Sequence, residues 1–220
     1  MMQGVTVQRS GTGFRWMAVS SILVLGLVVG CTGRPKVTHS GFLRDYSQLK
    51  LEEDGAKRYL NPSKNLRQYK KFIIDPVVVH FAPKAKGTAI DPAKLKELSD
   101  YFRNQLVKGL SKRYRVVRSS GPGVLRVRIA ITDIKKTTRV ANIHPAMKMS
   151  GIGLGGGAME AEAVDSVSGD RVAAVVDAQS GRRLGITAGL KKYGHAQQVM
   201  VGWVERFVKR LDKAHGYKGK

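Results

Sequence analysis

Residues 125–132 have the sequence LRVRIAIT, in which the odd-numbered side chains are all apolar. Successive side chains of a β-strand point to opposite faces, so the apolar residues would share one face, with Arg126 and Arg128 on the other. One apolar face and one wet, basic face are typical of an antiparallel sheet that buries a single side. This stretch therefore predicts a strand of such a sheet.

Four other segments are also predicted to be strands, because they are rich in β-branched, aromatic or alternating apolar residues. They cover residues 71–83, 113–120, 158–167 and 171–178. Pro76 interrupts the first of them, which indicates an edge position or a bulge, since proline cannot donate to the ladder. Ser168-Gly169-Asp170 separates the last two, so these two are expected to form a hairpin.

Two segments have the apolar spacing of helices. The first begins after Asp91, which can cap it, with Pro92 in its first turn. Its apolar residues recur at spacings of three and four: Leu95, Leu98, Phe102, Leu106, Leu110 and Tyr114. The second covers residues 194–214 and has a broad apolar stripe that includes Val199 and Trp203. A stripe of that width is expected to lie on a sheet.

The expected elements follow the order strand, helix, strand, strand, loop, strand, strand, helix. Helices separated by runs of strands are typical of an α+β fold. We therefore expect a two-layer sandwich with a mostly antiparallel sheet and two main helices on one face. It would form a single domain over residues 42–217, with irregular structure from residues 40–62 packed on it.

The chain of 220 residues is strongly basic, with 39 Lys plus Arg against 16 Asp plus Glu and a formal charge of +23. A field of this sign attracts phospholipid headgroups, lipopolysaccharide phosphates, acidic glycans or nucleic acid. Nucleic acid is disfavoured, because few aromatic residues accompany the cations and because the amino terminus indicates export. With 42% hydrophobic residues the chain can build a core, which argues against wholesale disorder.

The amino-terminal segment has the features of a secretory signal. Residues 1–15 contain Arg9 and Arg15 and no acid, and residues 16–30 contain no charge. The apolar run is shorter than the roughly 20 residues that a spanning helix needs. It ends in the sequence VVGC (28–31), which resembles the lipobox of bacterial lipoproteins. The alternative is an uncleaved anchor helix with a buried cysteine.

The lipobox resemblance implies a diacylglyceryl group on the sulfur of Cys31, cleavage of the signal after Gly30, and acylation of the new amino terminus. Cys31 is the only cysteine, and its neighbours favour lipidation over a catalytic or free thiol. Several acyl chains would hold the protein on the membrane almost irreversibly. Residues 31–41 would then form a lipidated tether. Thr32 replaces the Asp that indicates inner-membrane retention, so an outer-membrane protein facing the periplasm is expected.

Three motifs resemble a family of uncharacterised proteobacterial lipoproteins that is classed as a domain of unknown function. They are SGFLRDYSQL (40–49), RYLNP (58–62) and YKKFIIDPVVV (69–79). The similarity extends through GGGAMEAEAVDSVSGDRVAAVVD (155–177) to the terminal helix. It implies a periplasm-facing lipoprotein and brings no substrate, cofactor or catalytic residue.

A long loop without acidic residues covers residues 137–157 and ends in the glycine-rich segment 151–157. Glycine-rich loops bind phosphate where they lead into a helix, but these glycines lead into a predicted strand, so a flexible turning loop is the simpler interpretation. Loops of this length are uncommon and often functional. A membrane or partner would meet these side chains: Arg139, Met147, Lys148, Met149, Ile152 and Leu154. The alternative is a mobile loop without a partner.

Catalytic and metal-binding sets are not apparent. The histidines lack the spacing of metal ligands: His39, His80, His144, His195 and His215. A structural aspartate is the simpler interpretation of Asp75, five residues before His80. Glu160 and Glu162 would share a solvated strand face, where pairing with Arg126 or Arg128 is simpler than acid–base catalysis. We therefore expect no enzyme, metal or cofactor; a hydrolase that uses these acids and His80 is the alternative.

The cations of the first helix and of the 125–132 strand could form an anion-binding surface. The candidates are Lys94, Arg103, Lys108, Lys112, Arg126 and Arg128. The favoured function is a non-enzymatic envelope lipoprotein that binds or supports another envelope component. The alternative is a binder of an anionic envelope polymer, peptidoglycan or lipopolysaccharide, through these cations. Salt would weaken polymer binding far more than a packed protein interface.

Overall fold

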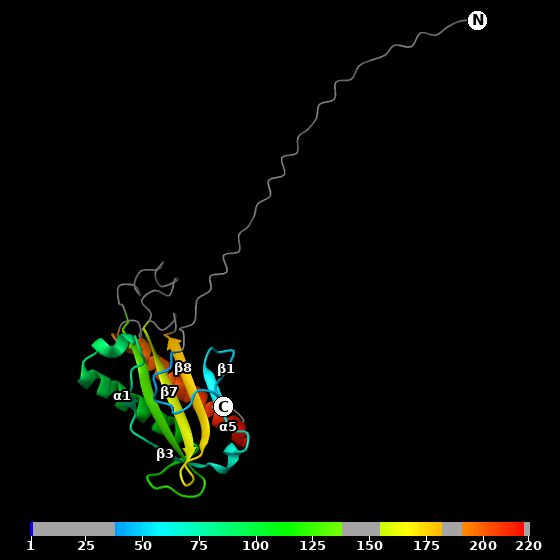
Figure 1. The fold of residues 1–220 in the computed structure, drawn as a ribbon, viewed down its shortest axis with the longest axis vertical. Coiled ribbons are helices and arrows are strands. Elements are labelled where there is room, and N and C mark those ends of the chain that lie inside the picture. Colours follow the sequence, from blue (N-terminus) through cyan, green and yellow to red (C-terminus); the bar gives the residue numbers. More distant parts are fainter. Residues whose placement is uncertain (2–37, 138–154, 182–190, 218–220) are drawn as a thin grey trace. The chain divides into compact units, whose positions relative to one another are not determined.

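A computed structural model describes residue 1 and residues 38–137, 155–181 and 191–217. The chain divides into two units, Met1–Cys31 and Thr32–Lys220. The fold described below is that of the second unit. It consists of one mixed sheet with two long helices on one of its faces (Figure 1).

Within the described residues the sheet has eight strands in the order β1-β2-β8-β7-β6-β3-β5, with β4 also paired to β6. The strands are β1 Lys50–Leu51, β2 Lys57–Leu60, β3 Lys71–Ile74, β4 Val78–Val79, β5 Arg115–Val116, β6 Val124–Lys135, β7 Gly156–Asp165 and β8 Arg171–Ser180. The helices are α1 Pro92–Leu110, α5 Gly194–His215 and the short 3-10 helices η1 Leu66–Gln68 and η2 Lys86–Ala89.

The centre of the sheet is an antiparallel meander of its three longest strands, β6, β7 and β8. Leu125 of β6 pairs with Asp165 of β7, and the chain returns into β8 through a turn at Gly169, whose φ of 74° favours glycine. The carboxylate of Asp165 closes the turn by accepting two of its backbone N–H groups. The predicted strand at 125–132 and the predicted hairpin are confirmed.

The other half of the sheet contains parallel pairs that the sequence did not predict, although most residue pairs of the sheet are antiparallel as expected. Strands β3 and β4 run parallel to β6, and β5 runs parallel to β3. Among the described residues, four strand pairs are antiparallel and three are parallel, so the sheet is mixed. Parallel strands must be joined by a crossover connection. Helix α1 is this crossover, since it follows β4 and precedes β5 in the chain and returns the chain along the sheet. The α+β class is confirmed.

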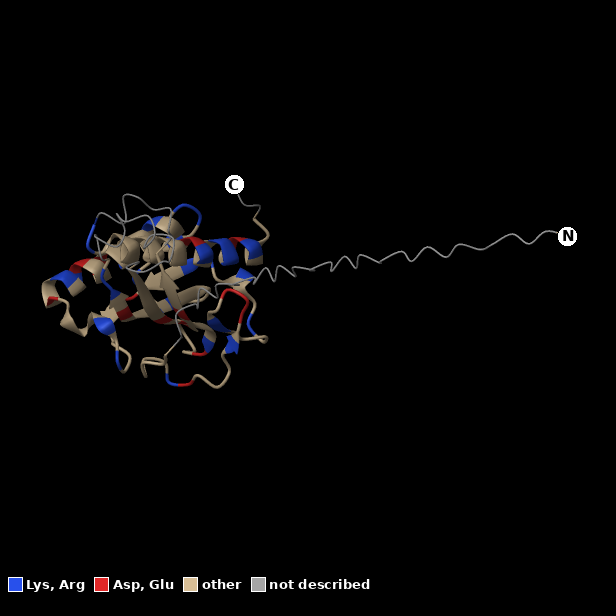
Figure 2. Ribbon diagram, turned by 90° about the horizontal axis from the view of Figure 1, so that it is seen from above, with Lys and Arg blue, Asp and Glu red and all other residues tan. Residues whose placement is uncertain are grey.

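Both long helices pack on the same face of the sheet (Figure 1, Figure 2). Helix α1 begins where the sequence predicts, since the Asp91 carboxylate accepts the N–H groups of Ala93 and Lys94. The rings of Phe102 and Trp203, one from each helix, lie 5.6 Å apart. The core between the helices and the sheet includes Leu98, Phe102, Leu106, Leu125, Val127, Ile129, Val199 and Trp203.

The opposite face of the sheet is covered by residues 38–49, which we call the strap. Leu43 of the strap is buried against Ala174 and Val176 of β8. The expectation of irregular structure over residues 40–62 is met by the strap and is wrong for the residues after it, because β1 and β2 are strands of the sheet. The wet face expected from the arginines of β6 is met at Arg126, which is exposed, and in part at Arg128, whereas Ala130 further along the same face is buried.

Candidate functional site

The polar centre beneath the strap is Glu160, a fully buried carboxylate of β7. Its Oε1 accepts the N–H of Ser40 at 2.6 Å. Its Oε2 accepts the hydroxyl of Tyr46 at 2.6 Å and the N–H of Leu43 at 3.4 Å. Burying a carboxylate is costly unless it is hydrogen-bonded, so the strap and Glu160 hold each other in place. We call this arrangement the clamp.

The strap reaches the clamp through its own sequence. Gly41 has a φ of 95°, a left-handed conformation that favours glycine. The Tyr46 hydroxyl accepts the N–H groups of Gly41 at 2.8 Å and Leu43 at 3.2 Å while it donates to Glu160. Burial, together with the bond to Glu160, raises the pKa of Tyr46. The SGFLRDYS motif therefore builds the clamp, a role that sequence reasoning missed.

Glu162 lies on the same strand face and has a different role. It is buried and forms ion pairs with Arg128 at 2.7 Å and Arg171 at 3.4 Å. The Arg128 guanidinium also lies 5.7 Å from the ring centroid of Phe42 in the strap. The predicted pairing of Glu162 with Arg128 is confirmed. The predicted solvated face for Glu160 and Glu162 is wrong, because the strap buries both.

Asp75 and His80 have separate surroundings. The Nε of Arg126 lies 3.0 and 2.9 Å from the two carboxylate oxygens of Asp75. His80 is exposed, and its ring centroid lies 6.3 Å from that of Phe42. Asp75 thus has the structural partner that the sequence favours.

On the helix side, sequence reasoning missed Asp177 of β8. This carboxylate is fully buried and accepts the indole N–H of Trp203 and the guanidinium of Arg206, both at 3.0 Å. A buried acid needs such donors, and α5 supplies them, so Asp177 fixes α5 against β8. The available signal was an aspartate at the end of the apolar run VAAVVD.

His195, in the first turn of α5, is the second residue that was missed. It is buried, and its Nδ1 accepts the N–H of Gly155 at 3.1 Å. Burial lowers the pKa of His195, which keeps the ring neutral. A Cβ on Gly181 would lie 2.4 Å from the His195 ring, so the chain can pass this ring only with a glycine there. His195 therefore joins α5 to the start of β7 and the end of β8.

The glycine-rich segment 151–157 is partly strand. Gly156 and Gly157 are the first residues of β7. A Cβ on Gly156 would lie 2.3 Å from the backbone oxygen of Gln179 in β8. The close approach of two strands therefore accounts for this glycine without a phosphate.

The end of the sheet where β6 and β8 finish is rich in lysine, and Figure 2 looks onto it. We call it the lysine end, and its described lysines are Lys84, Lys86, Lys135, Lys136, Lys191 and Lys192. Two hydrogen bonds bring these segments to the end of β6. The Asp133 carboxylate accepts the N–H of Lys86 at 2.8 Å, and the N–H of Thr137 donates to the backbone oxygen of Lys192 at 2.9 Å.

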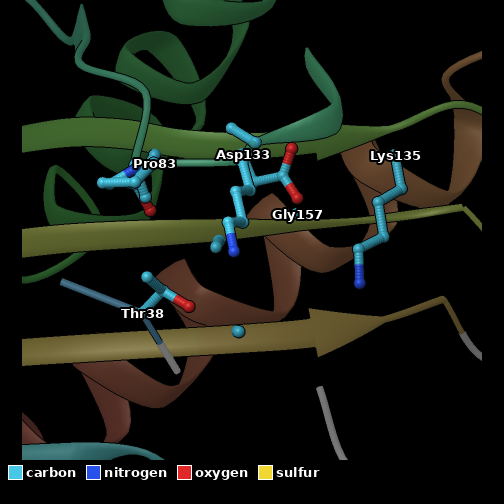
Figure 3. Close-up of a pocket in the computed structure, with 11 residues that line it drawn as sticks. Thr38, Pro83, Asp133, Lys135 and Gly157 are labelled. Carbon is cyan, nitrogen blue, oxygen red and sulfur yellow. The ribbon is translucent and has the colours of Figure 1, made fainter. Parts of the chain in front are cut away.

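A shallow hollow lies in the lysine end, with about 420 Å³ of empty space that includes open solvent. Thr38, Pro83, Asp133, Lys135 and Gly157 line it together with Lys84 and Thr132 (Figure 3). The hydroxyl of Thr132 is buried there and has no hydrogen-bond partner among the described residues. The hollow therefore presents the ammonium groups of Lys84 and Lys135, while the Thr132 hydroxyl lies buried behind its lining.

The six cations predicted as an anion-binding surface are not brought together. Four have internal partners: Lys94 with Glu97, Arg103 with the Ile74 oxygen, Arg126 with Asp75 and Arg128 with Glu162. Lys108 and Lys112 are exposed at the end of α1. Because α1 and the arginines of β6 lie on opposite faces of the sheet, they do not form one surface.

Other predicted residues lie outside the described part of the chain. They are Gly30, Cys31, Arg139, Met147, Lys148, Met149, Ile152 and Leu154. Within the described ranges, His, Cys, Asp and Glu form no group of three or more that could hold a metal ion. Neither α1 nor α5 is long and apolar enough to cross a membrane.

The mixed sheet and its helices form a small α+β domain. The strap is fixed on this domain through the clamp. The family model described as Protein of unknown function (DUF3313) matches residues 38–207. The chain belongs to this family. The match begins with the strap and ends within α5, so it includes the clamp.

The chain is also similar to Uncharacterized lipoprotein YdcL of Escherichia coli (strain K12), with 27% identity over 124 residues. The alignment covers 53% of this chain and 54% of YdcL, so the chain spans about half the length of that relative. The family and this relative agree with the lipobox and with the predicted resemblance to uncharacterised lipoproteins. They support the assignment of the chain as an envelope-associated lipoprotein.

Two solved structures are more distantly similar. A PelC dodecamer from Paraburkholderia phytofirmans has a TM-score of 0.41 and 10% identity, over 74% of this chain and 98% of that chain. Protein XCC0632 from Xanthomonas campestris has a TM-score of 0.40 and 11% identity, over 71% and 91% of the two chains. These scores are too low to transfer an assembly or an activity to this protein.

Proposed function

We propose that the mature protein is a non-enzymatic lipoprotein of the outer membrane, lipidated on Cys31 after cleavage behind Gly30. Its domain would face the periplasm and bind or support another envelope component. The lipobox and the lipoprotein relative support the anchor. The clamp is the observation on which we base the proposal that the domain binds or supports another envelope component.

The clamp gives the tether a fixed point of attachment. Ser40 donates a hydrogen bond to Glu160 in β7, one of the central strands. Leu43 and Tyr46 donate hydrogen bonds to the same carboxylate. A tether that ends on a central strand holds the domain at a fixed point of its surface. That arrangement suits a protein that positions a binding surface close to the membrane.

The contacts of the acidic candidates support a non-enzymatic role. Asp75 is paired with Arg126, Glu162 with Arg128, and Glu160 with the strap. Each carboxylate is therefore occupied by a structural partner. A catalytic acid would instead need to reach the substrate. The internal pairing of four candidate cations likewise favours a protein partner over an anionic polymer.

The proposal is tested by crosslinking in intact envelopes, followed by capture of the wild-type chain and of Cys31→Ser. The expected result is a partner that is crosslinked to the anchored form and lost from Cys31→Ser. The partner should still be captured when the envelopes are washed with salt before the crosslinker is added, whereas a polymer complex would dissociate steeply as ionic strength rises.

The lipid anchor is tested in the same preparations by the mass of the mature chain and by its membrane fractionation. The mature wild-type chain should have the mass of a lipidated protein that begins at Cys31, and Cys31→Ser should leave the membrane fraction. Retention of Cys31→Ser on membranes after the salt wash would contradict the anchor. Equal crosslinking of both forms would contradict the supporting role at the membrane.

A further inference from the structure

The lysine end lies beside the point where the tether enters the domain. Thr38 lines the same hollow as Lys84 and Lys135 (Figure 3), and the clamp holds the chain from Ser40 onward. The seven residues 32–38 span at most about 25 Å when fully extended. A lipid on Cys31 would therefore keep Thr38 within this distance of the membrane.

The length of the tether restricts which end of the domain can face the membrane. Strand β7 has 10 residues, a length of about 33 Å, and it leads from the lysine end to the turn at Gly169. With that turn against the membrane, Thr38 would lie about 33 Å away, beyond the reach of the tether. If the long strands stand perpendicular to the membrane, the lysine end must therefore face the lipid.

The charges at this end suit an anionic lipid surface. Lys84, Lys86, Lys136, Lys191 and Lys192 are exposed, and Lys135 is half-buried. The nearby acids have partners of their own: backbone N–H groups of Lys86 and Gly87 for Asp133, those of Ala93 and Lys94 for Asp91, and the Lys94 ammonium for Glu97. Lysines attract anionic headgroups only within about one Debye length of the surface, so the short tether is what makes their charge effective.

We propose that the lysine end is the membrane-contacting surface of the domain and that its lysines bind the phosphates of anionic phospholipid headgroups. In the hollow, a phosphate oxygen would meet the ammonium groups of Lys84 and Lys135. The inference rests on the lipidation of Cys31, which belongs to the proposed function.

The test uses the full chain, processed and lipidated in a bacterial host, in phospholipid discs of phosphatidylcholine alone or with phosphatidylglycerol. Hydrogen exchange is followed by mass spectrometry. In anionic discs, peptides that contain 133–137 and 191–193 should exchange on the order of five-fold more slowly than in neutral discs. The peptide that contains the turn at Gly169 should exchange equally in both.

Two variants with the same change of charge locate the effect. One replaces Lys84, Lys135 and Lys192 with Gln, and it should lose the difference between the two kinds of disc. The control replaces Lys108, Lys112 and Lys209 with Gln, in or next to the last turns of α1 and α5, and should keep it. Equal unfolding midpoints show that both variants are folded.

Each other outcome overturns the inference in a distinguishable way. Equal exchange in both kinds of disc, or equal loss in both variants, contradicts the lysine end as the contact and leaves the anchor intact. Protection at the turn would assign the contact to the opposite end. A chain that does not stay in the discs would contradict the anchor, and the inference with it.

Discussion

The two faces of the sheet are covered by different means. On the helix face, large apolar side chains such as Phe102 and Trp203 fill the space between two long helices and the sheet. On the strap face, the buried apolar cluster is small and centres on Leu43, while Glu160 supplies the hydrogen bonds. The difference indicates that the helix face stabilises the fold and that the other face holds the strap. The strap should therefore detach without unfolding the domain.

The largest expected effect is on the helix face. Phe102→Ala removes a buried ring of the main core and should lower the free energy of unfolding by about 3–5 kcal/mol. Urea unfolding followed by circular dichroism measures this loss. Leu43→Ala in the small cluster beneath the strap should cost less, about 2 kcal/mol, the lower end of the range for a buried leucine. Equal losses would contradict the division of roles between the two faces.

The next effect concerns the clamp. Glu160→Gln keeps the shape of the side chain but replaces one acceptor oxygen with a donor that opposes the strap's own donors. The free energy of unfolding should fall by about 2 kcal/mol, the range for hydrogen bonds to a buried charged group. Urea unfolding is again the measurement, and an unchanged free energy would show that the clamp contributes nothing to stability.

A pH dependence should arise on the helix face from His195. Burial lowers its pKa in the folded protein, so the unfolded chain binds the proton more readily. Its contribution to stability is complete above about pH 6.5 and falls as the pH drops toward the folded pKa, by at most about 1.4 kcal/mol per pH unit. His195→Gln should flatten the dependence between pH 7.5 and 5.5, whereas His80→Gln, at an exposed histidine, should retain it. Equal slopes in all three proteins would refute the assignment.

The smallest expected effect is that of one donor in the clamp. Tyr46→Phe removes the hydroxyl that bonds Glu160 and that accepts the N–H groups of Gly41 and Leu43. The bond to the carboxylate contributes about 1.5 kcal/mol, at the lower end for a charged group, and the Leu43 N–H keeps its bond to Glu160, so the loss should be smaller than that of Glu160→Gln. A larger loss than for Glu160→Gln would show that Tyr46, and not the carboxylate, organises the strap.

The apolar core of the helix face could be predicted from the sequence, and the strap with its clamp could not. Periodicity identifies α1, α5 and the meander because their apolar residues repeat locally, as from Leu98 to Phe102 or from Leu125 to Val127. The parallel pairs of β3, β4 and β5 were missed, since these strands are short and their partners are set by the crossover through α1.

The clamp was missed because it joins residues far apart in the chain. Nothing near Glu160 in the sequence indicates that a buried carboxylate would meet Ser40, Leu43 and Tyr46. The pairing of Glu162 with Arg128 was predictable, because both side chains stand on one face of adjacent strands. The alternation of β6 correctly indicated a second face but not the strap that covers it.

Hydrogen exchange at the strap amides tests the central claim, that Glu160 holds the strap on the sheet. In the full-length wild type, the amides of Ser40 and Leu43 should be protected. Glu160→Gln should abolish this protection while the amides of β6 and α5 stay protected, and Glu162→Gln, two residues away, should leave the strap protected. Equal protection of Ser40 and Leu43 in Glu160→Gln and wild type would contradict the claim.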